Sequence, residues 1–275
     1  MTLVSLSDVL QPAQTGGYAV AGLVVLGWED ARAYVAAAEA EGAPVILQAG
    51  PGCRAHTPLP ILGTMFRHLA EQASVPIVAH LDHGYTVAEC AEAIECGFTS
   101  VMFDGSKLPL ADNIAQTKAI AKMAHAAGVS IEGEIGVVGY ADRAMSHGTN
   151  PEEARQFAAE TGIDAMAISI GNVHLQTTQN AAVDLELLRS IELVTDVPLV
   201  LHGSSGIPAS ARRDLALKTR VCKFNVGTEL RQVFGSSLRS EMARNPAEFD
   251  RIKLLSATEA PLRDAARTVI ANLRP

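Results

Sequence analysis

The stretch VPIVAHLDHGYT, residues 75–86, indicates both the fold of this chain and the place of its chemistry. Its first four residues form an apolar, β-branched run of the kind that becomes a buried strand. The run then ends in His80, Asp82 and His83, three titratable side chains within four positions. A core strand with this ending predicts that its C-terminal end opens onto a functional site.

Seven further apolar runs accompany this one, and segments with helical spacing lie between them. The runs cover residues 18–26, 44–50, 100–106, 130–136, 164–171, 198–204 and 221–227. Several of the helical segments end in glycine, which is frequent where helices end. Eight strands, each followed by a helix and each apolar on both faces, are typical of a closed parallel barrel.

An open, doubly wound sheet is the competing architecture. It usually contains fewer such units, and no G-x-G-x-x-G pattern follows the first run. We therefore predict an α/β fold, a (β/α)8 TIM barrel, as a single domain over residues 1–275. A leading helix at residues 5–14 and a helical tail at residues 246–273 should flank the barrel, and no linker rich in Pro, Gly or Ser divides the chain.

The composition narrows the class of partner. The chain has 275 residues and a formal net charge of −8, without a basic tract, which argues against nucleic acid or an anionic membrane surface. Its four cysteines form no C-x-x-C pair, so neither a zinc ribbon nor a dithiol site is indicated. No signal-like leader or long apolar run is present. We expect a soluble, cytoplasmic protein that acts on a small molecule.

Chemistry in such a barrel lies at the C-terminal ends of the strands, and most of the predicted strands end in polar residues. Asp82 belongs to the third predicted strand. In the later strands the polar residues are Asp104 in the fourth strand, Glu132 and Glu134 in the fifth strand, Asn172 and His174 just after the sixth strand, His202 in the seventh strand and Asn225 in the eighth strand. The first two strands end without such groups, in VVLG and LQAG.

Each of these residues alone is more often structural, because a strand-end His usually hydrogen-bonds and an Asp or Glu often caps the next helix. A functional role becomes more favourable when several such residues are expected to meet at one place. His83, His174 and His202 come from three strands that open onto one mouth, and three imidazoles with an open position are a recurring catalytic zinc set. With Asp82 beside one ligand, a metal could polarise an oxygen while a carboxylate moves a proton.

Two glycine-containing turns form a second group, GSSG at 203–206 and NVGT at 225–228. Glycine lets the backbone approach an anion closely, and the turns after strands seven and eight are where barrels commonly hold phosphate. Either turn alone is more simply an ordinary strand-to-helix connection. Together they predict a phosphate site.

The motifs HLDH (80–83), DGS (104–106), EGEIG (132–136), VLHGSSGIP (200–208) and NVGTEL (225–230) make a family resemblance specific. The chain resembles the class II, zinc-dependent ketose-bisphosphate aldolases, the fructose- and tagatose-bisphosphate aldolase family, and is nearest the short tagatose-type branch. The similarity extends from residue 5 to residue 231.

The resemblance implies a role for each matched position. His83, His174 and His202 match the zinc ligands, and Asp82 matches the carboxylate that protonates the aldehyde-derived oxygen in condensation and takes the proton back in cleavage. Asp104 and Glu134 match residues that hold the metal in an alternate position or support it. His80 shares the inward face with Asp82, and we expect it to support a ligand from behind.

Further matched positions concern the substrate. The implied contacts to dihydroxyacetone phosphate are Gly203, Ser204, Ser205, Asn225, Val226, Gly227 and Thr228. The implied activity is reversible retro-aldol cleavage of a ketose (bis)phosphate or related sugar, through a metal-stabilised enediolate, to dihydroxyacetone phosphate or a similar ketone donor and an aldehyde. The resemblance also implies one catalytic Zn²⁺ and a site for a second metal or a monovalent cation. Three histidines accept Co²⁺ or Mn²⁺ as well. The oligomeric state that it implies is a homodimer or homotetramer.

Three departures from the family pattern predict an altered substrate. The first strand reads AGLV at 21–24 where the family reads like PAFN, and Leu175 stands where a glycine contributes a phosphate contact. The loop GYADRAMSHGTN at 139–150 is shorter than in the family, with Tyr140 in place of its second glycine. Asp142 is nearest the family's proton-shuttling Glu. We assign it that role, and we expect the loop from 137 to 150 to order on substrate binding.

Two alternatives remain open from the sequence. One is a metal-dependent sugar-phosphate isomerase or epimerase that uses the same enediolate without breaking a carbon–carbon bond. The other is a non-catalytic, aldolase-like subunit that binds a sugar phosphate. The presence of Asp82 together with all three histidines counts against the second alternative.

Overall fold

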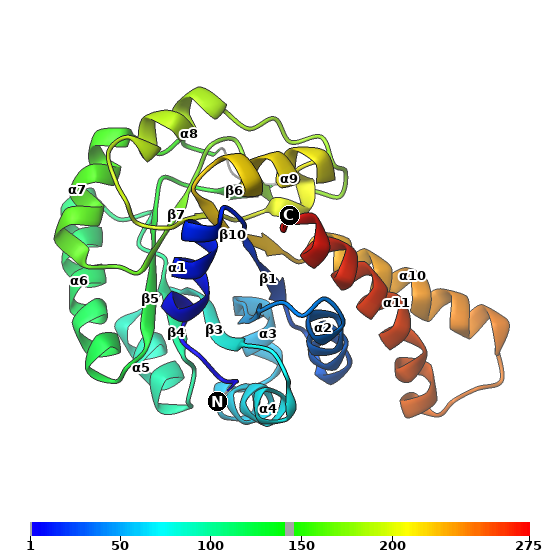
Figure 1. The fold of residues 1–275 in the computed structure, drawn as a ribbon. Coiled ribbons are helices and arrows are strands. Elements are labelled where there is room, and N and C mark those ends of the chain that lie inside the picture. Colours follow the sequence, from blue (N-terminus) through cyan, green and yellow to red (C-terminus); the bar gives the residue numbers. More distant parts are fainter. Residues whose placement is uncertain (1, 141–145) are drawn as a thin grey trace.

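Eight parallel strands close into a barrel in the computed structural model, which describes residues 2–140 and 146–275. The strands run in the order β1-β10-β9-β7-β5-β4-β3-β2 around the barrel, so strands that follow one another in the chain lie side by side (Figure 1). Their bounds are β1 Val20–Val24, β2 Val45–Ala49, β3 Ile77–Gly84, β4 Ser100–Phe103, β5 Ser130–Ile135, β7 Ala165–Ile168, β9 Leu199–Leu201 and β10 Val221–Val226. The predicted barrel is confirmed, and each strand lies within its predicted run except β3, which extends one residue beyond His83 to Gly84.

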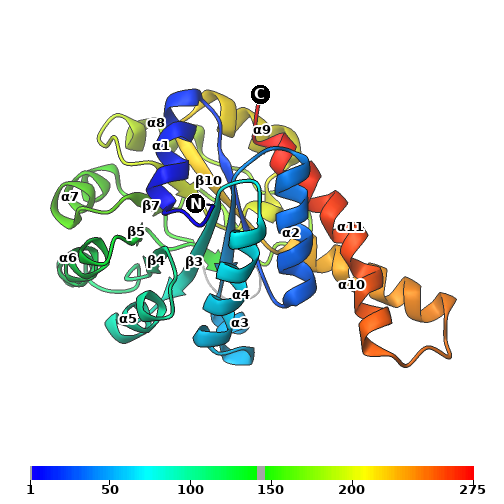
Figure 2. The same cartoon turned by 60° about the horizontal axis from the view of Figure 1, so that its bottom comes forward.

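Helices surround the barrel as an outer layer (Figure 2). In chain order they are α1 Leu6–Gly16, α2 Trp28–Ala40, α3 Pro51–His56, α4 Leu59–Gln72, α5 Val87–Glu95, α6 Leu110–Ala126, α7 Pro151–Thr161, α8 Leu185–Glu192, α9 Ala209–Lys218, α10 Thr228–Arg244 and α11 Arg251–Asn272, with a short 3-10 turn η1 Ser204–Gly206. Most of the barrel strands are followed by one of these helices, as the alternating sequence pattern predicts.

The leading helix α1 seals the end of the barrel opposite the strand carboxyl ends. Its N-cap is Ser5, whose side chain accepts a hydrogen bond from the Asp8 amide, and its C-cap is Gly17 with φ of 65°. Its buried Leu6 and Leu10 pack against residues near the starts of the strands, such as Val20. The opposite end of the barrel is thereby left as the only mouth for a ligand within the described residues.

The predicted helical tail of residues 246–273 is present as α11, Arg251–Asn272. Helices α10 and α11 form a hairpin that projects from the barrel beside α2 (Figures 1 and 2). Helix α11 is anchored by buried Leu262, Ala266 and Ile270, whereas α10 buries only Leu230.

A small additional sheet lies above the mouth, and the sequence patterns do not predict it. Strand β6, Gly139–Tyr140, pairs in parallel with β8, Val173–His174. Below this pair, Val137 and His147 exchange two backbone hydrogen bonds of 3.0 and 2.9 Å. These bonds join the two described ends of the loop from 137 to 150, and the β6–β8 pairing connects the start of that loop to the segment after β7. None of the described helices is long and apolar enough to cross a membrane.

Candidate active site

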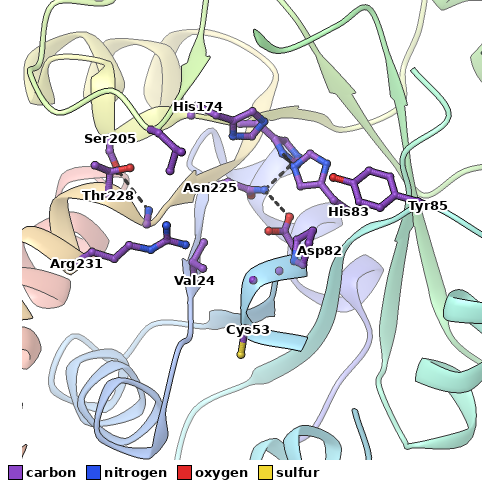
Figure 3. A pocket seen from close by; sticks show the side chains of 17 residues that line it. Val24, Cys53, Asp82, His83, Tyr85, His174, Ser205, Asn225, Thr228 and Arg231 are labelled. Atoms are coloured by element: carbon purple, nitrogen blue, oxygen red, sulfur yellow. Dashed lines mark hydrogen bonds between the residues drawn. The ribbon is translucent and has the colours of Figure 1, made fainter. Parts of the chain in front are cut away.

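A cavity of about 260 Å³ opens at the carboxyl ends of the strands (Figure 3). Nine of the residues predicted for the site line it: Asp82, His83, His174, His202, Gly203, Ser205, Asn225, Gly227 and Thr228. Val24 and Leu175, two of the departures from the family pattern, line it as well, and so do Tyr85 and Arg231. The strand ends therefore meet in one place, as the barrel topology requires.

The three predicted histidine ligands form one cluster at the base of this cavity. One ring nitrogen from each of His83, His174 and His202 lies within 4.8 Å of the others, which is the spacing of ligands that share one metal ion. In a second group, His83 with Asp104 and Glu134, one ligand atom from each residue also lies within 4.8 Å of the others. The structure thus brings together all five residues predicted to hold or support a metal.

Hydrogen bonds fix which nitrogens face the centre of the cluster. Nδ1 of His83 donates to Asp104 at 2.9 Å, and Nε2 of His202 donates to Glu132 at 2.9 Å. The remaining nitrogens, Nε2 of His83 and Nδ1 of His202, face each other 3.0 Å apart, a distance that requires either a proton on one of them or a cation between them. A divalent metal such as zinc can take the place of that proton, so the donor set fits such an ion.

The electrostatics of the cluster agree with that fit. Burial alone would lower the pKa of His83, but the charge of Asp82 and the hydrogen bond to Asp104 raise it to about 9. Burial and then the positive charge of His83 lower the pKa of His174 to about 3, and the same two causes lower the pKa of His202. The three imidazoles together thus favour one bound proton, and a metal ion can replace that proton.

The two supporting carboxyl groups differ in their preferred state. Burial opposes ionisation of Asp104, but the hydrogen bond and charge of His83 hold its pKa well below the usual range. Burial and the charge of Asp104 raise the pKa of Glu134. Oε2 of Glu134 lies 3.6 Å from Nδ1 of His83 and has no hydrogen-bond partner among the described residues. A buried, unpaired oxygen beside a ligand suits an alternate or second cation position.

Two amide side chains hold the carboxylate of Asp82. Gln48 and Asn225 donate to the same oxygen, Oδ1, at 3.1 and 3.3 Å. Within the described part of the chain, Oδ2 accepts no hydrogen bond, and it lies near Gly50 at the cavity wall. Gly22 makes this arrangement possible, because a Cβ there would lie 2.1 Å from the Gln48 amide oxygen.

Gln48 corrects one expectation from the sequence, in which the LQAG ending of the second strand looked featureless. Its side chain is fully buried and contacts the residue predicted to move the proton. The only signal in the sequence is an amide in an otherwise apolar strand, and its partner lies 34 positions away.

A charged network lies beneath the histidines, out of reach of solvent. Nζ of Lys223 donates to Oε2 of Glu132 at 2.6 Å and lies 3.2 Å from Nε2 of His80. The other nitrogen of His80 faces Ser100 at 2.8 Å. Burial and the adjacent Lys223 lower the pKa of His80, so its ring is neutral and supports the network from behind. Lys223 was not predicted for the site.

Two residues of the site adopt left-handed backbone conformations without being glycine. His83 has φ of 53° and Leu175 has φ of 58°. Such conformations cost roughly 1–2 kcal/mol for residues other than glycine. The glycine that the family has at the position of Leu175 would accept this φ without strain. The leucine keeps the turn and adds a side chain to the cavity wall.

The predicted phosphate turns are only partly available to a ligand. The hydroxyl oxygen of Ser205 accepts hydrogen bonds from the amides of Gly227 and Glu229, both at 3.3 Å, so its own proton is free to be donated into the cavity. Ser204 instead donates to the Leu201 carbonyl, and both Ser204 and Val226 are buried away from the cavity lining.

Arg231 is a second residue that sequence reasoning did not assign to the site. It lies in the first turns of α10 and extends towards Val24 along the cavity (Figure 3). In the described ranges its guanidinium makes neither a hydrogen bond nor an ion pair, whereas the nearby Glu229 is paired with Arg212. Arg231 therefore brings a positive charge to the cavity wall, and the same charge also acts on the buried carboxyl of Asp30. Asp142, the predicted proton shuttle, lies outside the described residues.

Comparisons with known proteins agree with this geometry. The family model described as fructose-bisphosphate aldolase class-II matches residues 4–274. The YdjI aldolase from Escherichia coli K12 has 28% sequence identity to this chain, with a TM-score of 0.86 over 98% of this chain and 97% of that one. A protein described as a putative fructose-1,6-biphosphate aldolase from Coccidioides immitis has 25% identity and a TM-score of 0.82, covering 98% and 96% of the two chains.

A third solved structure supports the fold alone. Fructose-bisphosphate aldolase from Campylobacter jejuni has 20% identity and a TM-score of 0.81, covering 98% of this chain and 95% of that one. None of these matches separates the tagatose-type branch from the rest of the family, so that assignment stays a prediction.

Proposed function

The chain belongs to the class II fructose-bisphosphate aldolase family, and on that premise we propose that it cleaves a phosphorylated ketose by a retro-aldol reaction. The products would be dihydroxyacetone phosphate, or a similar phosphorylated ketone, and an aldehyde. The observation that carries this proposal is the joint presence of a three-histidine cluster and the carboxylate of Asp82 in one cavity.

Asp82 would move the proton at the oxygen that becomes the aldehyde. As the carbon–carbon bond breaks, this hydroxyl loses its proton to Oδ2, while the bonding electron pair passes towards the ketone carbonyl of the donor. Oδ1 is held by Gln48 and Asn225, so Oδ2 is the oxygen free to react. In the reverse direction the same oxygen returns the proton. General acid–base catalysis of this kind contributes roughly 10²- to 10⁴-fold.

His83, His174 and His202 would hold a zinc ion, which when bound supplies a Lewis acid that polarises the donor carbonyl. Asp104 and Glu132 orient two of these rings through their second nitrogens. Glu134, with its unpaired oxygen, is the group that we propose for an alternate or second cation position.

The donor phosphate would lie at the turns that follow β9 and β10. Ser205 can donate its hydroxyl proton, and Gly203, Gly227 and Thr228 line the same wall. Because the amides of Gly227 and Glu229 are already bonded to Ser205, most of the favourable charge would come from Arg231. A guanidinium binds phosphate through two parallel hydrogen bonds.

The proton of the donor carbon needs a separate base. We propose Asp142 for this step from its place in the sequence alone. Val137 and His147, which lie on either side of it in the sequence, are joined by two backbone hydrogen bonds.

Proton exchange tests the proposed function without knowledge of the aldehyde. The zinc-loaded protein is incubated with dihydroxyacetone phosphate, and separately with dihydroxyacetone, in D₂O, and the hydroxymethyl proton signal is followed by NMR. We expect stereospecific exchange of one proton of the phosphorylated ketone, and its loss after chelation of the metal. Exchange of dihydroxyacetone alone would contradict the phosphorylated donor, and exchange of neither would contradict donor activation altogether.

Product analysis then separates an aldolase from an isomerase. Two carbonyl fragments from one sugar phosphate are the expected result, whereas a single isomer would favour the isomerase or epimerase alternative.

We also propose that the chain forms a homodimer or homotetramer. The α10–α11 hairpin supports this, since Phe249 and Ile252 at its tip are 92% and 74% exposed. Sedimentation analysis, with Phe249→Ser as a disrupting variant, tests the proposal, and a monomeric parent protein would contradict it.

A further inference from the structure

Arg54 is a nearly buried residue that lies next to the site without lining it. Its side chain is 8% exposed, and it comes from the short helix α3 that follows β2. Nη1 donates to the backbone carbonyls of Ala49 and Asp82 at 2.9 and 2.7 Å, and Nη2 donates to the carbonyl of His83 at 3.0 Å. One guanidinium thus joins the ends of β2 and β3 at the two residues that carry the proposed chemistry.

The backbone at this point departs from the regular ladder. The pairing of β3 with β4 shifts in register between Leu81 and Gly84, and His83 between them has φ of 53°. An irregular, buried backbone leaves carbonyls without the partners that a regular sheet supplies, and such groups need other donors. Arg54 supplies donors to Asp82 and His83.

The left-handed conformation of His83 also needs support from its surroundings. A strained conformation of this kind persists only where neighbouring contacts determine it. The ring of His83 must point into the metal cluster while the adjacent carboxylate of Asp82 points towards the substrate space. The two carbonyls held by Arg54 lie on either side of the His83 Cα, so their position sets the direction of both side chains.

An arginine suits this task better than a lysine, because its planar fork presents several donors in fixed directions. Its charge is balanced by Glu89, whose carboxylate lies 3.5 Å from Nη2 and also accepts from the amides of Tyr85 and Thr86. The contacts of Arg54 therefore extend, through Glu89, to the start of α5. The simplest alternative is that Arg54 only stabilises a strand-to-helix connection.

We propose that Arg54 is a positioning residue, which acts through the backbone of Asp82 and His83 to aim the proposed base and one proposed metal ligand. The inference rests on the proposed function of this site. It predicts an effect of Arg54 on metal affinity and turnover that exceeds its effect on stability.

The test compares Arg54→Gln and Arg54→Lys with the matched control Arg220→Gln. Arg220 also donates to a backbone carbonyl, that of Thr195, and to the carboxylate of Asp196, but it precedes β10 at the far end of the barrel. Four experiments are made on each variant. They give the zinc affinity by chelator competition, kcat and KM for proton exchange, the visible spectrum of the Co²⁺ form, and hydrogen exchange of the peptide that contains residues 77–86 in the metal-free protein.

We expect Arg54→Gln to weaken zinc binding about 10- to 100-fold, the range typical of groups that orient metal ligands. At saturating metal, kcat should fall with KM little changed, the Co²⁺ spectrum should change, and exchange should quicken in residues 77–86. Arg54→Lys should recover part of each effect. Arg220→Gln should lose thermal stability and keep metal affinity, spectrum and kcat.

Two outcomes would overturn the proposal. One is an Arg54→Gln protein with parental zinc affinity and Co²⁺ spectrum. The other is a set of losses no different from those of Arg220→Gln. If the parental protein shows no proton exchange, the proposed function fails, but the affinity, the spectrum and hydrogen exchange still decide the role of Arg54.

Discussion

The carboxylate of Glu132 and the ring of His202 lie 2.9 Å apart in the centre of the barrel, where neither side chain reaches solvent. The other oxygen of Glu132 accepts from Lys223 at 2.6 Å. A buried cation and a proposed metal ligand thus share one anion. The orientation of the His202 ring therefore depends on the same carboxylate that neutralises Lys223.

Removal of that anion should destabilise the protein strongly. Glu132→Gln leaves the ammonium group of Lys223 buried without its counterion, and breaking such a pair costs about 3–5 kcal/mol. Urea denaturation of the metal-free protein measures the change. The double variant Glu132→Gln/Lys223→Met should recover most of the stability while binding zinc more weakly than the parent. A double variant no more stable than Glu132→Gln alone would refute the pairing as the cause.

Asp82→Asn should abolish most of the turnover and leave the metal in place. The amide keeps the shape of the carboxylate but cannot take a proton, so we expect kcat to fall about 10²- to 10⁴-fold. Zinc content by metal analysis should stay at the parental level, because Asp82 is outside the three-histidine cluster. Parental kcat in this variant would remove Asp82 from the mechanism.

Metal binding should release a proton near neutral pH. The pKa of about 9 for His83 means that the metal-free ring is protonated below about pH 9, whereas a metal ligand must be unprotonated. Zinc affinity should therefore increase about tenfold per pH unit up to about pH 9 and then level off. Calorimetry in buffers with different ionisation enthalpies counts the released protons. Affinity that is already constant above about pH 6.5, the ordinary pKa of histidine, would contradict the raised value.

Leu175→Gly should improve the donor site without harming the fold. At φ of 58° glycine removes strain of roughly 1–2 kcal/mol but gains freedom in the unfolded chain, so stability should change by less than about 1 kcal/mol. The smaller residue opens the cavity wall, and KM for a phosphorylated ketone should fall severalfold. Leu193→Gly, at an 87% exposed position away from the cavity, serves as the control. An increased KM would show that the leucine contributes to binding.

Arg231→Gln should weaken binding of phosphorylated donors specifically. Loss of a hydrogen-bonded charge pair costs about 1.5–3 kcal/mol, which corresponds to an increase in KM of about 10- to 100-fold. Arg239→Gln, two turns further along the same helix, provides the comparison, because that residue does not line the cavity. Equal KM values for the two variants would place the phosphate elsewhere.

The barrel and the strand-end residues could be predicted because both depend on local sequence. Strands covered on both faces appear as apolar runs, and the polar residues that close each run must meet at one mouth. His80, Asp82 and His83 were recognised on that basis alone. The same reasoning locates His174 only approximately, since it forms part of β8, a strand that exists through pairing with β6.

Gln48, Arg54, Lys223 and Arg231 could not be predicted, for a common physical reason. Each acts through contacts that the closure of the barrel creates. Lys223 in VCKFNV resembles a strand residue that faces solvent, yet the register of β10 places it on the barrel interior next to Glu132, 91 positions away. Arg54 and Arg231 lie on helices whose neighbours are known only from the fold. The tagatose-type assignment, the cytoplasmic location and the role of Asp142 stay predictions.

The short pairing of β6 with β8 has a consequence for how such a protein can evolve. Gly139 is paired with Val173 and Tyr140 with His174, so the start of the loop from 137 to 150 is joined directly to the segment that carries one proposed metal ligand. A substitution that shifts this start to admit a new sugar would displace that ligand too. Under the proposed function, substrate range and metal retention would therefore be inherited together, and selection on one would change the other.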